Sequence, residues 1–197
     1  MHGHAQTTAA LRYPDPMPAL SFRPLVRDDF AMLSRWLAEP HVAKWWCSPS
    51  DMAYIEHEYG PAIDGADPTE LFVLQREDQP IGLFQRYLLD DYPDWAAAVG
   101  FTGAAGIDYL IGEPALVGQG IGSRAIRIFT ADALARYPGA NAVVAAPQQA
   151  NLASWKALER AGFERAWAGQ LESDDPGDAG PAYVYCLRRG SPIGPPV

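Results

Sequence analysis

The sequence predicts an α/β protein, and three observations lead to this prediction. Strand-like and helix-like segments follow one another in the order βααβββαβαββ. One strand-like segment, residues 106–111, carries a single carboxylate, Asp108, in an otherwise apolar run. A glycine-rich turn at residues 117–122 follows this segment and opens a helix. The chain of 197 residues is long enough for one such domain with its own hydrophobic core.

The first elements are a strand and two helices. Residues 20–24 are expected to form the strand. Asp28 is expected to cap a helix that ends near Pro40, and Ser50 to cap a second helix over residues 51–59. The apolar face of the first helix carries Phe30, Leu33, Trp36 and Leu37.

A hairpin and a long loop are expected next. Residues 71–75 and 81–88 are typical of two strands joined by turn residues at 76–80. Residues 89–105 form a long, acidic and aromatic segment that we expect to be a loop before the strand at 106–111. A loop of this length inside a compact domain usually has a function or is disordered.

The rest of the domain is expected to alternate between helices and strands. The expected elements are a helix at 121–137, a buried strand at 142–146, a helix at 151–161 closed by Gly162, and strands at 163–168 and 182–187 on either side of an acidic loop at 169–181. The folded domain is therefore expected to span residues 20–189. Residues 1–19 and 190–197 are rich in small, polar and proline residues, and we expect them to be flexible tails.

Composition excludes several classes of function. The net charge of −9 disfavours nucleic-acid binding. It would attract a cationic small molecule, but surplus carboxylates that only confer solubility are the alternative, and composition does not choose between the two. No apolar run is long enough to cross a membrane, and no secretory signal is recognisable. Cys47 and Cys186 form no metal or redox motif, so we expect reduced thiols, no bound metal and a cytoplasmic location. The sequence does not distinguish a monomer from a homodimer.

The glycine-rich turn is expected to bind a pyrophosphate. Gly118, Gly120 and Gly122 allow the backbone to curl, so that several N–H groups at the start of the helix converge on one anion. A dinucleotide-binding turn was the alternative. It requires a strand directly before the first glycine and an acidic residue at the end of the next strand. Residues 113–114 separate the strand from the glycines, and residues 142–146 end without an acid, so this alternative fails.

Asn151 and residues 159–163 complete a wider pattern. Together with the glycine turn they resemble the acyl-CoA-binding core of the GCN5-related N-acetyltransferases, over about residues 20–189. The resemblance implies a mixed sheet with helices on both faces, whose fourth and fifth strands splay apart around the acyl chain of acetyl-CoA, the acyl donor. The donor-binding residues that it implies are Ile111, Val117, Gly118, Gln119, Gly120, Ile121, Gly122, Ser123, Arg124 and Asn151.

Further motifs resemble one branch of this family, the aminoglycoside 6′-N-acetyltransferases, which are associated with antibiotic resistance. They are residues 41–46 (His-x-x-x-Trp-Trp), 58–61, 80–87, 94–95 and 180–185, in the order of that branch. The resemblance implies an acceptor that is a primary amine of a cationic small molecule. The substrate-binding residues that it implies are Trp46, Tyr59, Asp67, Gln85, Asp94 and Trp95. His41 and His57 are expected to be packing or surface residues.

Two other functions stay open. Siderophore-building lysine N-acyltransferases share the histidine–tryptophan segment, but they carry histidine where this chain has Asp108 and aspartate where it has Ala146. An acceptor that is a protein N-terminus belongs to the same alternative. A catalytically weak CoA-binding domain is the other, since Leu158 replaces the tyrosine that in many acetyltransferases protonates the departing thiolate.

The chemistry of acyl transfer assigns roles to three consecutive residues. The attacking amine must lose a proton, and Asp108 is expected to accept it, directly or through water. The carbonyl oxygen gathers negative charge, and a backbone N–H near Tyr109 or Leu110 is expected to stabilise it. An aspartate in an apolar strand is costly unless it is used, which favours the catalytic role of Asp108.

Overall fold

The computed structural model describes residues 18–191. Most of the expected tails, residues 1–17 and 192–197, therefore lies outside the described residues. Seven strands form one sheet in the order β1-β2-β3-β4-β5-β7-β6. The strands are β1 (Leu20–Pro24), β2 (Glu70–Arg76), β3 (Gln79–Leu88), β4 (Ala105–Ile111), β5 (Ala142–Ala145), β6 (Glu164–Leu171) and β7 (Gly180–Arg188). Only the β4–β5 pair is parallel among these strands, so the mixed sheet is confirmed.

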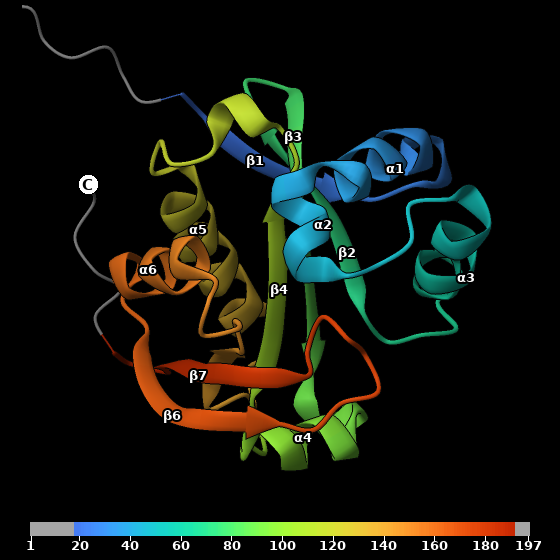
Figure 1. Cartoon of the computed structure of the whole chain (residues 1–197). Helices are drawn as coiled ribbons and strands as arrows, with labels where there is room; N and C mark the ends of the chain where they lie inside the picture. Colours follow the sequence, from blue (N-terminus) through green and yellow to red (C-terminus); the bar gives the residue numbers. More distant parts are fainter. Residues whose placement is uncertain (1–17, 192–197) are drawn as a thin grey trace, which may run out of the picture.

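Helices cover both faces of the sheet (Figure 1). They are α1 (Phe30–Ala38), α2 (Pro40–Trp46), α3 (Met52–Ile63), α4 (Pro93–Val99), α5 (Ile121–Arg136) and α6 (Leu152–Ala161). The helices α1 to α3 share one hydrophobic cluster with Val73 of β2, Leu83 of β3 and Leu110 of β4. The other face of the sheet packs against α5 and α6, with Phe84 and Phe129 fully buried at its centre. A third cluster joins α4 to the β5–β7 end.

The two central strands part early. Within residues 18–191, the parallel pairing of β4 with β5 is confined to Ala105 with Val143 and Gly106 with Val144. The rest of β4 stays paired with β3 up to Ile111, so a gap opens on its other edge. The splayed strands implied by the resemblance are confirmed. Such a gap leaves backbone groups and side chains of β4 accessible to a ligand, since no neighbouring strand occupies that edge.

The N-terminal helices differ from the sequence-based expectation in their boundaries. A 3-10 turn at Arg27–Asp29 precedes α1, so Asp28 does not cap a helix. Instead, the Asp29 carboxylate accepts a hydrogen bond from the Val26 N–H at 3.0 Å and pairs with Arg23. Residues 40–46, expected to be a connection, form the short helix α2, whose start at Pro40 suits the fixed φ of proline.

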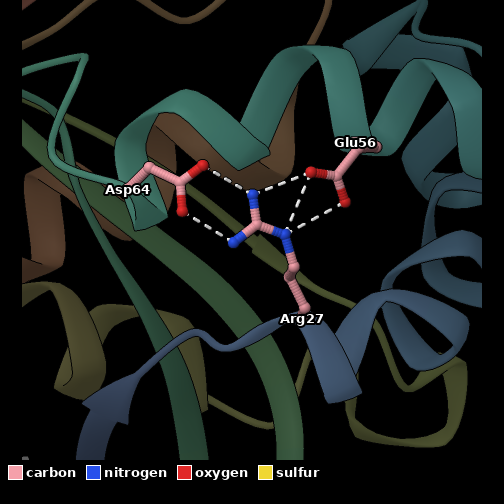
Figure 2. A network of polar contacts seen from close by, with 3 residues as sticks. All are labelled: Arg27, Glu56 and Asp64. Carbon is pink, nitrogen blue, oxygen red and sulfur yellow. Dashed lines mark hydrogen bonds and ion pairs between the residues drawn. The ribbon is translucent and has the colours of Figure 1, made fainter.

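The helix α3 is capped one residue later than expected and is longer. The Asp51 carboxylate, rather than Ser50, accepts the hydrogen bond from the Tyr54 N–H at 3.0 Å. The helix continues through Pro61 to Ile63 instead of ending at residue 59. It is held against the start of α1 by Arg27, whose guanidinium reaches Glu56 and Asp64 at 2.8 Å each (Figure 2). This bridge fixes the helix that supplies one wall of the site described below.

Helical structure also occupies part of the segment expected to be a loop. Residues 89–105 contain a 3-10 turn, Leu89–Asp91, and the helix α4, which Gly100 ends in the left-handed conformation. The strands β6 and β7 extend further towards their loop than expected, because Gly169 to Leu171 pair with Gly180 to Ala182. Among residues 18–191, no helix is long and apolar enough to cross a membrane.

Candidate active site between the parted strands

The glycine turn at residues 117–122 has the geometry of an anion site. Gly118 and Gly120 have φ angles of +81° and +77°, which side-chain-bearing residues rarely adopt. Gly120 is the N-cap residue of α5, so the first N–H groups of this helix face outward from the turn. Gly122 differs from the expectation, because it lies inside the helix with a helical backbone, where an added Cβ atom would be 3.9 Å from Ala157 of α6. Two glycines, not three, therefore curl the backbone.

Other residues that were expected to bind acetyl-CoA instead hold this turn in place. Gln119 donates a hydrogen bond to the Ala115 carbonyl at 2.6 Å, and Ser123 donates to the Gly120 carbonyl at 2.9 Å. Arg124 donates to the Pro18 carbonyl at 3.1 Å, while Ile121 is buried in the core. Val117 is largely exposed. Hydrogen bonds on the protein side thus hold the turn in place, and its outward-facing backbone N–H groups can bind a ligand.

The segment between β4 and the glycine turn is fastened by α1 and α2. His41 Nε2 lies 2.9 Å from the carbonyl oxygen of Ile111, and Trp36 Nε1 donates to Glu113 at 2.9 Å. Gly112 lies against the Trp36 ring so closely that a Cβ atom would clash with it at 2.1 Å. His41 therefore positions the end of β4, which agrees with its expected packing role.

A pocket of about 150 Å³ passes through the gap between β4 and β5. On one side it reaches Asn151 and Ser154 at the start of α6, where the Asn151 side chain caps the helix by accepting from the Ser154 N–H at 3.2 Å. On the other side it reaches Asp108 and the aromatic residues of α2 and α3. A second pocket of about 290 Å³ adjoins it and also contains Asp108. The two pockets share Gln85, Asp108 and the carboxylates Glu58, Asp175 and Asp178, so the start of α6 and an acidic chamber meet at Asp108.

Asp108 is the central carboxylate of this cavity. Burial raises its pKa, hydrogen bonds from Gln85 and Tyr87 lower it, and the charge of Asp175 raises it further, with a net rise. Gln85 Nε2 donates to Asp108 Oδ2 at 3.0 Å. A carboxylate with a raised pKa is a better base near neutral pH than an ordinary aspartate. The predicted base therefore lies in an environment suited to accepting a proton.

The loop between β6 and β7 brings two further carboxylates to Asp108. Asp175 and Asp178 line both pockets, and burial, followed by the charge of Asp108, raises the pKa of Asp178 to about 7. Gln148 holds the loop by donating to the Gly177 carbonyl at 2.8 Å. Gly177 lies so close to the end of α2 that a Cβ atom would be 2.7 Å from the Trp46 carbonyl oxygen. Glycine is thus required for this close approach.

The structure gathers most of the expected substrate residues around the cavity. Trp46, Tyr59 and Gln85 line the first pocket, and Asp67 and Trp95 line the second. The Asp67 carboxylate accepts hydrogen bonds from the Thr69 N–H and the Tyr92 hydroxyl, at 2.8 Å each. Trp95 donates to the Tyr87 hydroxyl at 3.0 Å. These two residues therefore also stabilise the chamber wall.

Asp94 is placed elsewhere. It is exposed at the start of α4 and lines a neighbouring groove with Glu172 and Asp174. It does not line either pocket that contains Asp108. Sequence reasoning also missed the individual aspartates at 175 and 178, although it noted the acidic loop that carries them. Nothing in the local pattern indicated that this loop folds back over β4.

The register of β4 distinguishes the two candidates for the N–H that stabilises the carbonyl oxygen. The Gly112 N–H donates to the Ile81 carbonyl of β3, so even-numbered residues of β4 direct their N–H groups to β3. The Leu110 N–H accordingly points to β3, and its side chain is buried under α1 to α3. The Tyr109 N–H points the opposite way, into the gap left by β5. This geometry favours Tyr109 over Leu110.

In residues 18–191 no cluster of three or more His, Cys, Asp or Glu side chains is arranged to hold a metal ion.

Comparison with known proteins decides the family. The model of the acetyltransferase (GNAT) domain matches residues 26–171. The chain belongs to the GNAT acetyltransferase family. It is therefore an acyltransferase, and the donor of this family is acetyl-CoA. The open glycine turn and the gap in the sheet fit such a donor.

Individual relatives of this GNAT protein are aminoglycoside-modifying enzymes. The aminoglycoside N(6′)-acetyltransferases type 1 of Klebsiella pneumoniae and Serratia marcescens are each 27% identical over 174 residues, covering 86% of this chain and 83% of theirs. The structure is similar to aminoglycoside acetyltransferase AAC(6′)-Ib in complex with coenzyme A, with a TM-score of 0.71 and 25% identity over 87% of this chain and 95% of that one. The same enzyme with coenzyme A and kanamycin gives a TM-score of 0.70, at 25% identity over the same shares of the two chains.

Proposed function

We propose that this GNAT protein transfers the acetyl group of acetyl-CoA to a primary amine of a cationic small molecule, with the 6′-amine of an aminoglycoside as the leading candidate. The observation that carries the proposal is the position of Asp108. It lies where the parted strands open into a chamber with three other carboxylates, Glu58, Asp175 and Asp178. The names of the relatives point to the same class of acceptor.

The residues at the gap divide the chemistry between them. Asp108 accepts the proton that the attacking amine releases, and Gln85 holds its carboxylate by a hydrogen bond. The N–H of Tyr109 donates to the carbonyl oxygen as negative charge develops there. The outward amides of the glycine turn bind the pyrophosphate of the donor, assisted by the N-terminal dipole of α5. Both substrates are thereby held with their reacting groups close together, which removes much of the entropic cost of their meeting.

The acidic chamber provides the selectivity for a cation. Burial raises the pKa values of Glu58 and Asp178, so both carboxyl groups bind protons more tightly than they would in water. An ammonium group that enters stabilises their charged forms and displaces protons. Trp46 and Tyr59 supply aromatic faces on which a sugar ring or an ammonium group can lie. A polycationic acceptor neutralises the charge of more of these carboxylates than a monoamine does.

The second candidate is a lysine-like or peptide amine. The loop of Asp175 to Asp178 covers the chamber and is fastened to Gln148 and the end of α2, which favours a compact acceptor over an extended peptide. A siderophore lysine or hydroxylysine would still fit this description. A CoA-binding domain without activity is the remaining alternative, motivated by Leu158, and the hydrogen bond from Gln85 to Asp108 in the pocket supports an active enzyme over it.

A thiol-release assay with acetyl-CoA tests the proposal. The acceptor panel contains kanamycin-type aminoglycosides, hydroxylysine derivatives and peptides. We expect turnover with aminoglycosides, and Asp178→Asn should raise KM for them about tenfold or more, as loss of one buried charge contact does. Asp94→Asn is the matched control, because this carboxylate lies outside both pockets. Turnover of lysine derivatives alone would transfer the assignment to the second candidate.

A further inference from the structure

We infer that the hydroxyl groups of Tyr109 and Ser154 form the proton-donating pair for the departing thiolate of CoA. The Tyr109 and Ser154 oxygens lie 2.8 Å apart, and both residues line the pocket in the gap between β4 and β5. The inference rests on the acyl-transfer reaction of the proposed function, but not on which amine is the acceptor.

The pair lies opposite the base. Successive residues of a strand point to opposite faces of the sheet, so Tyr109 points to the α6 side whereas Asp108 points to the chamber under α3. The acyl group is placed in the gap between these two faces, since the pocket in that gap is lined both by Asp108 and by Tyr109 and Ser154. The amine then approaches from the side of Asp108, and the sulfur atom departs on the side of Tyr109 and Ser154.

Both hydroxyl groups are held in place by their surroundings. The Tyr109 ring stacks on Phe84, with 5.5 Å between the ring centroids and 25° between their planes. Ser154 lies in the first turn of α6, where its N–H donates to the capping side chain of Asn151. Burial raises the pKa of Tyr109, so the phenol keeps its proton over the working pH range. A donor of this kind is available before the C–S bond begins to break.

Leu158 cannot supply this proton, and its surroundings explain why the donor has to come from elsewhere. Its side chain is fully buried in the core cluster and does not line the pocket. It lies one helical turn after Ser154, so the first turn of α6, not the second, faces the gap. A tyrosine at position 158 would overpack this core, which typically destabilises a protein by about 1–3 kcal/mol.

The protons of the step balance once Asp108 returns the proton of the amine to the water of the pocket. The amine nitrogen forms a bond to the carbonyl carbon, and its proton passes to Asp108. The C–S bond breaks with its electron pair on sulfur, and the sulfur takes the proton of the Tyr109 hydroxyl. Ser154, which hydrogen bonds the phenol oxygen, returns a proton to it from pocket water. The net products are the amide and CoA with a free thiol.

Turnover measurements provide the first test. Tyr109→Phe removes the hydroxyl group and keeps the ring that stacks on Phe84. We expect kcat to fall about 10- to 100-fold with the KM of the acceptor unchanged, at the low end for acid catalysis because a thiol of ordinary pKa near 8.5 leaves without a strong acid. Tyr137→Phe is the matched control: it also removes a half-buried tyrosine hydroxyl, one that donates to Glu70 at 3.1 Å outside the pocket.

Titration of bound CoA provides a test that requires no acceptor. The ultraviolet absorbance of the CoA thiolate is followed against pH in complexes with the wild type, Tyr109→Phe and Ser154→Ala, with desulfo-CoA as the blank. A hydrogen bond to sulfur favours its charged form, so the thiol should titrate about one pH unit lower in the wild type than in Tyr109→Phe. Ser154→Ala should fall between them.

The two measurements separate a catalytic from a structural role. Equal titration midpoints in the wild type and both variants would overturn the inference, even if kcat fell in Tyr109→Phe. If Tyr109→Phe does not fold, the Ser154→Ala midpoint decides in the same way. Absence of aminoglycoside turnover by the wild type would contradict the proposed acceptor, but it would leave the CoA titration unaffected.

Discussion

Asp178→Asn should make the protein more stable, and increasingly so as the pH rises. The folded state raises the pKa of Asp178 from its ordinary value of 3.8 to about 7, mainly through burial and then through the charges of Asp108 and Asp175. Below pH 4 the carboxyl group is protonated in both the folded and the unfolded state, so it costs nothing. Between about pH 4 and 7 only the folded state keeps the proton, and the free energy of unfolding falls as the pH increases.

The size of this effect follows from the two pKa values. A rise from 3.8 to about 7 corresponds to about 4 kcal/mol at 1.36 kcal/mol per pH unit. Because Asp178 is only partly buried, solvent screens its charge, and about half of this is expected in practice. Asparagine keeps the shape but has no charge, and the loop keeps the backbone hydrogen bond from residue 178 to the Asp175 carbonyl at 3.1 Å. Removing the charge of residue 178 also removes its repulsion of Asp108, and this too raises the free energy of unfolding.

Urea unfolding at pH 5 and pH 8 measures the effect. The stability advantage of Asp178→Asn over the wild type should grow by about 1 to 1.5 kcal/mol between these two pH values. The reason is that about two thirds of the range between the two pKa values, 3.8 and about 7, lies above pH 5. Asp174→Asn is the control, since this exposed carboxylate lies in the same loop but outside both pockets. A difference that is constant with pH, or that shrinks towards pH 8, would refute the burial of a charge at position 178.

Three further predictions concern the base, the donor site and the acceptor. Asp108→Asn keeps the hydrogen-bonding size but accepts no proton, so steady-state kinetics should show kcat lowered by about 10²–10⁴-fold, a CoA affinity unchanged by calorimetry, and a loss that shrinks as the pH rises. Gly120→Val should abolish the rise in Tm that acetyl-CoA causes. Gly100→Val is the control and should retain this rise, because Gly100 is an equally open glycine with a φ of +72°. A retained rise in folded Gly120→Val would exclude the turn as the pyrophosphate site. Raising ionic strength should increase KM for a polycationic acceptor more than KM for acetyl-CoA, and equal insensitivity of both would count against electrostatic capture.

Local signals in the chain predicted the order of the elements. Glycines at 118 and 120 are required by a backbone with positive φ, and that requirement depends on only a few neighbouring residues. The alternation of residues along β3 and β4, and Gly162 at the end of α6, are equally local. The boundaries were less accurate at α1 and α3. At α3, two adjacent polar residues could each act as the cap, and Asp51 does so. At α1, Asp29 pairs with Arg23 and no side chain caps the helix.

The sequence by itself also indicated the family and the carboxylate at its centre. An aspartate inside an apolar strand is costly unless it has a role, so Asp108 could be selected before its neighbours were known. The same reasoning could not place Asp94. A carboxylate in a surface segment carries no such cost, and its direction depends on how α4 packs.

Only the tertiary structure decided which groups meet Asp108. Asp175 and Asp178 belong to the loop between β6 and β7, and they reach Asp108 because β7 pairs with β5 and Gln148 holds the loop against the end of α2. The same packing directs Ser154 to Tyr109 and buries Leu158. These pairs are distant in sequence, and their energies arise from desolvation and charge at short range. Such energies exist only once the chain is folded, which is why no local pattern indicated them.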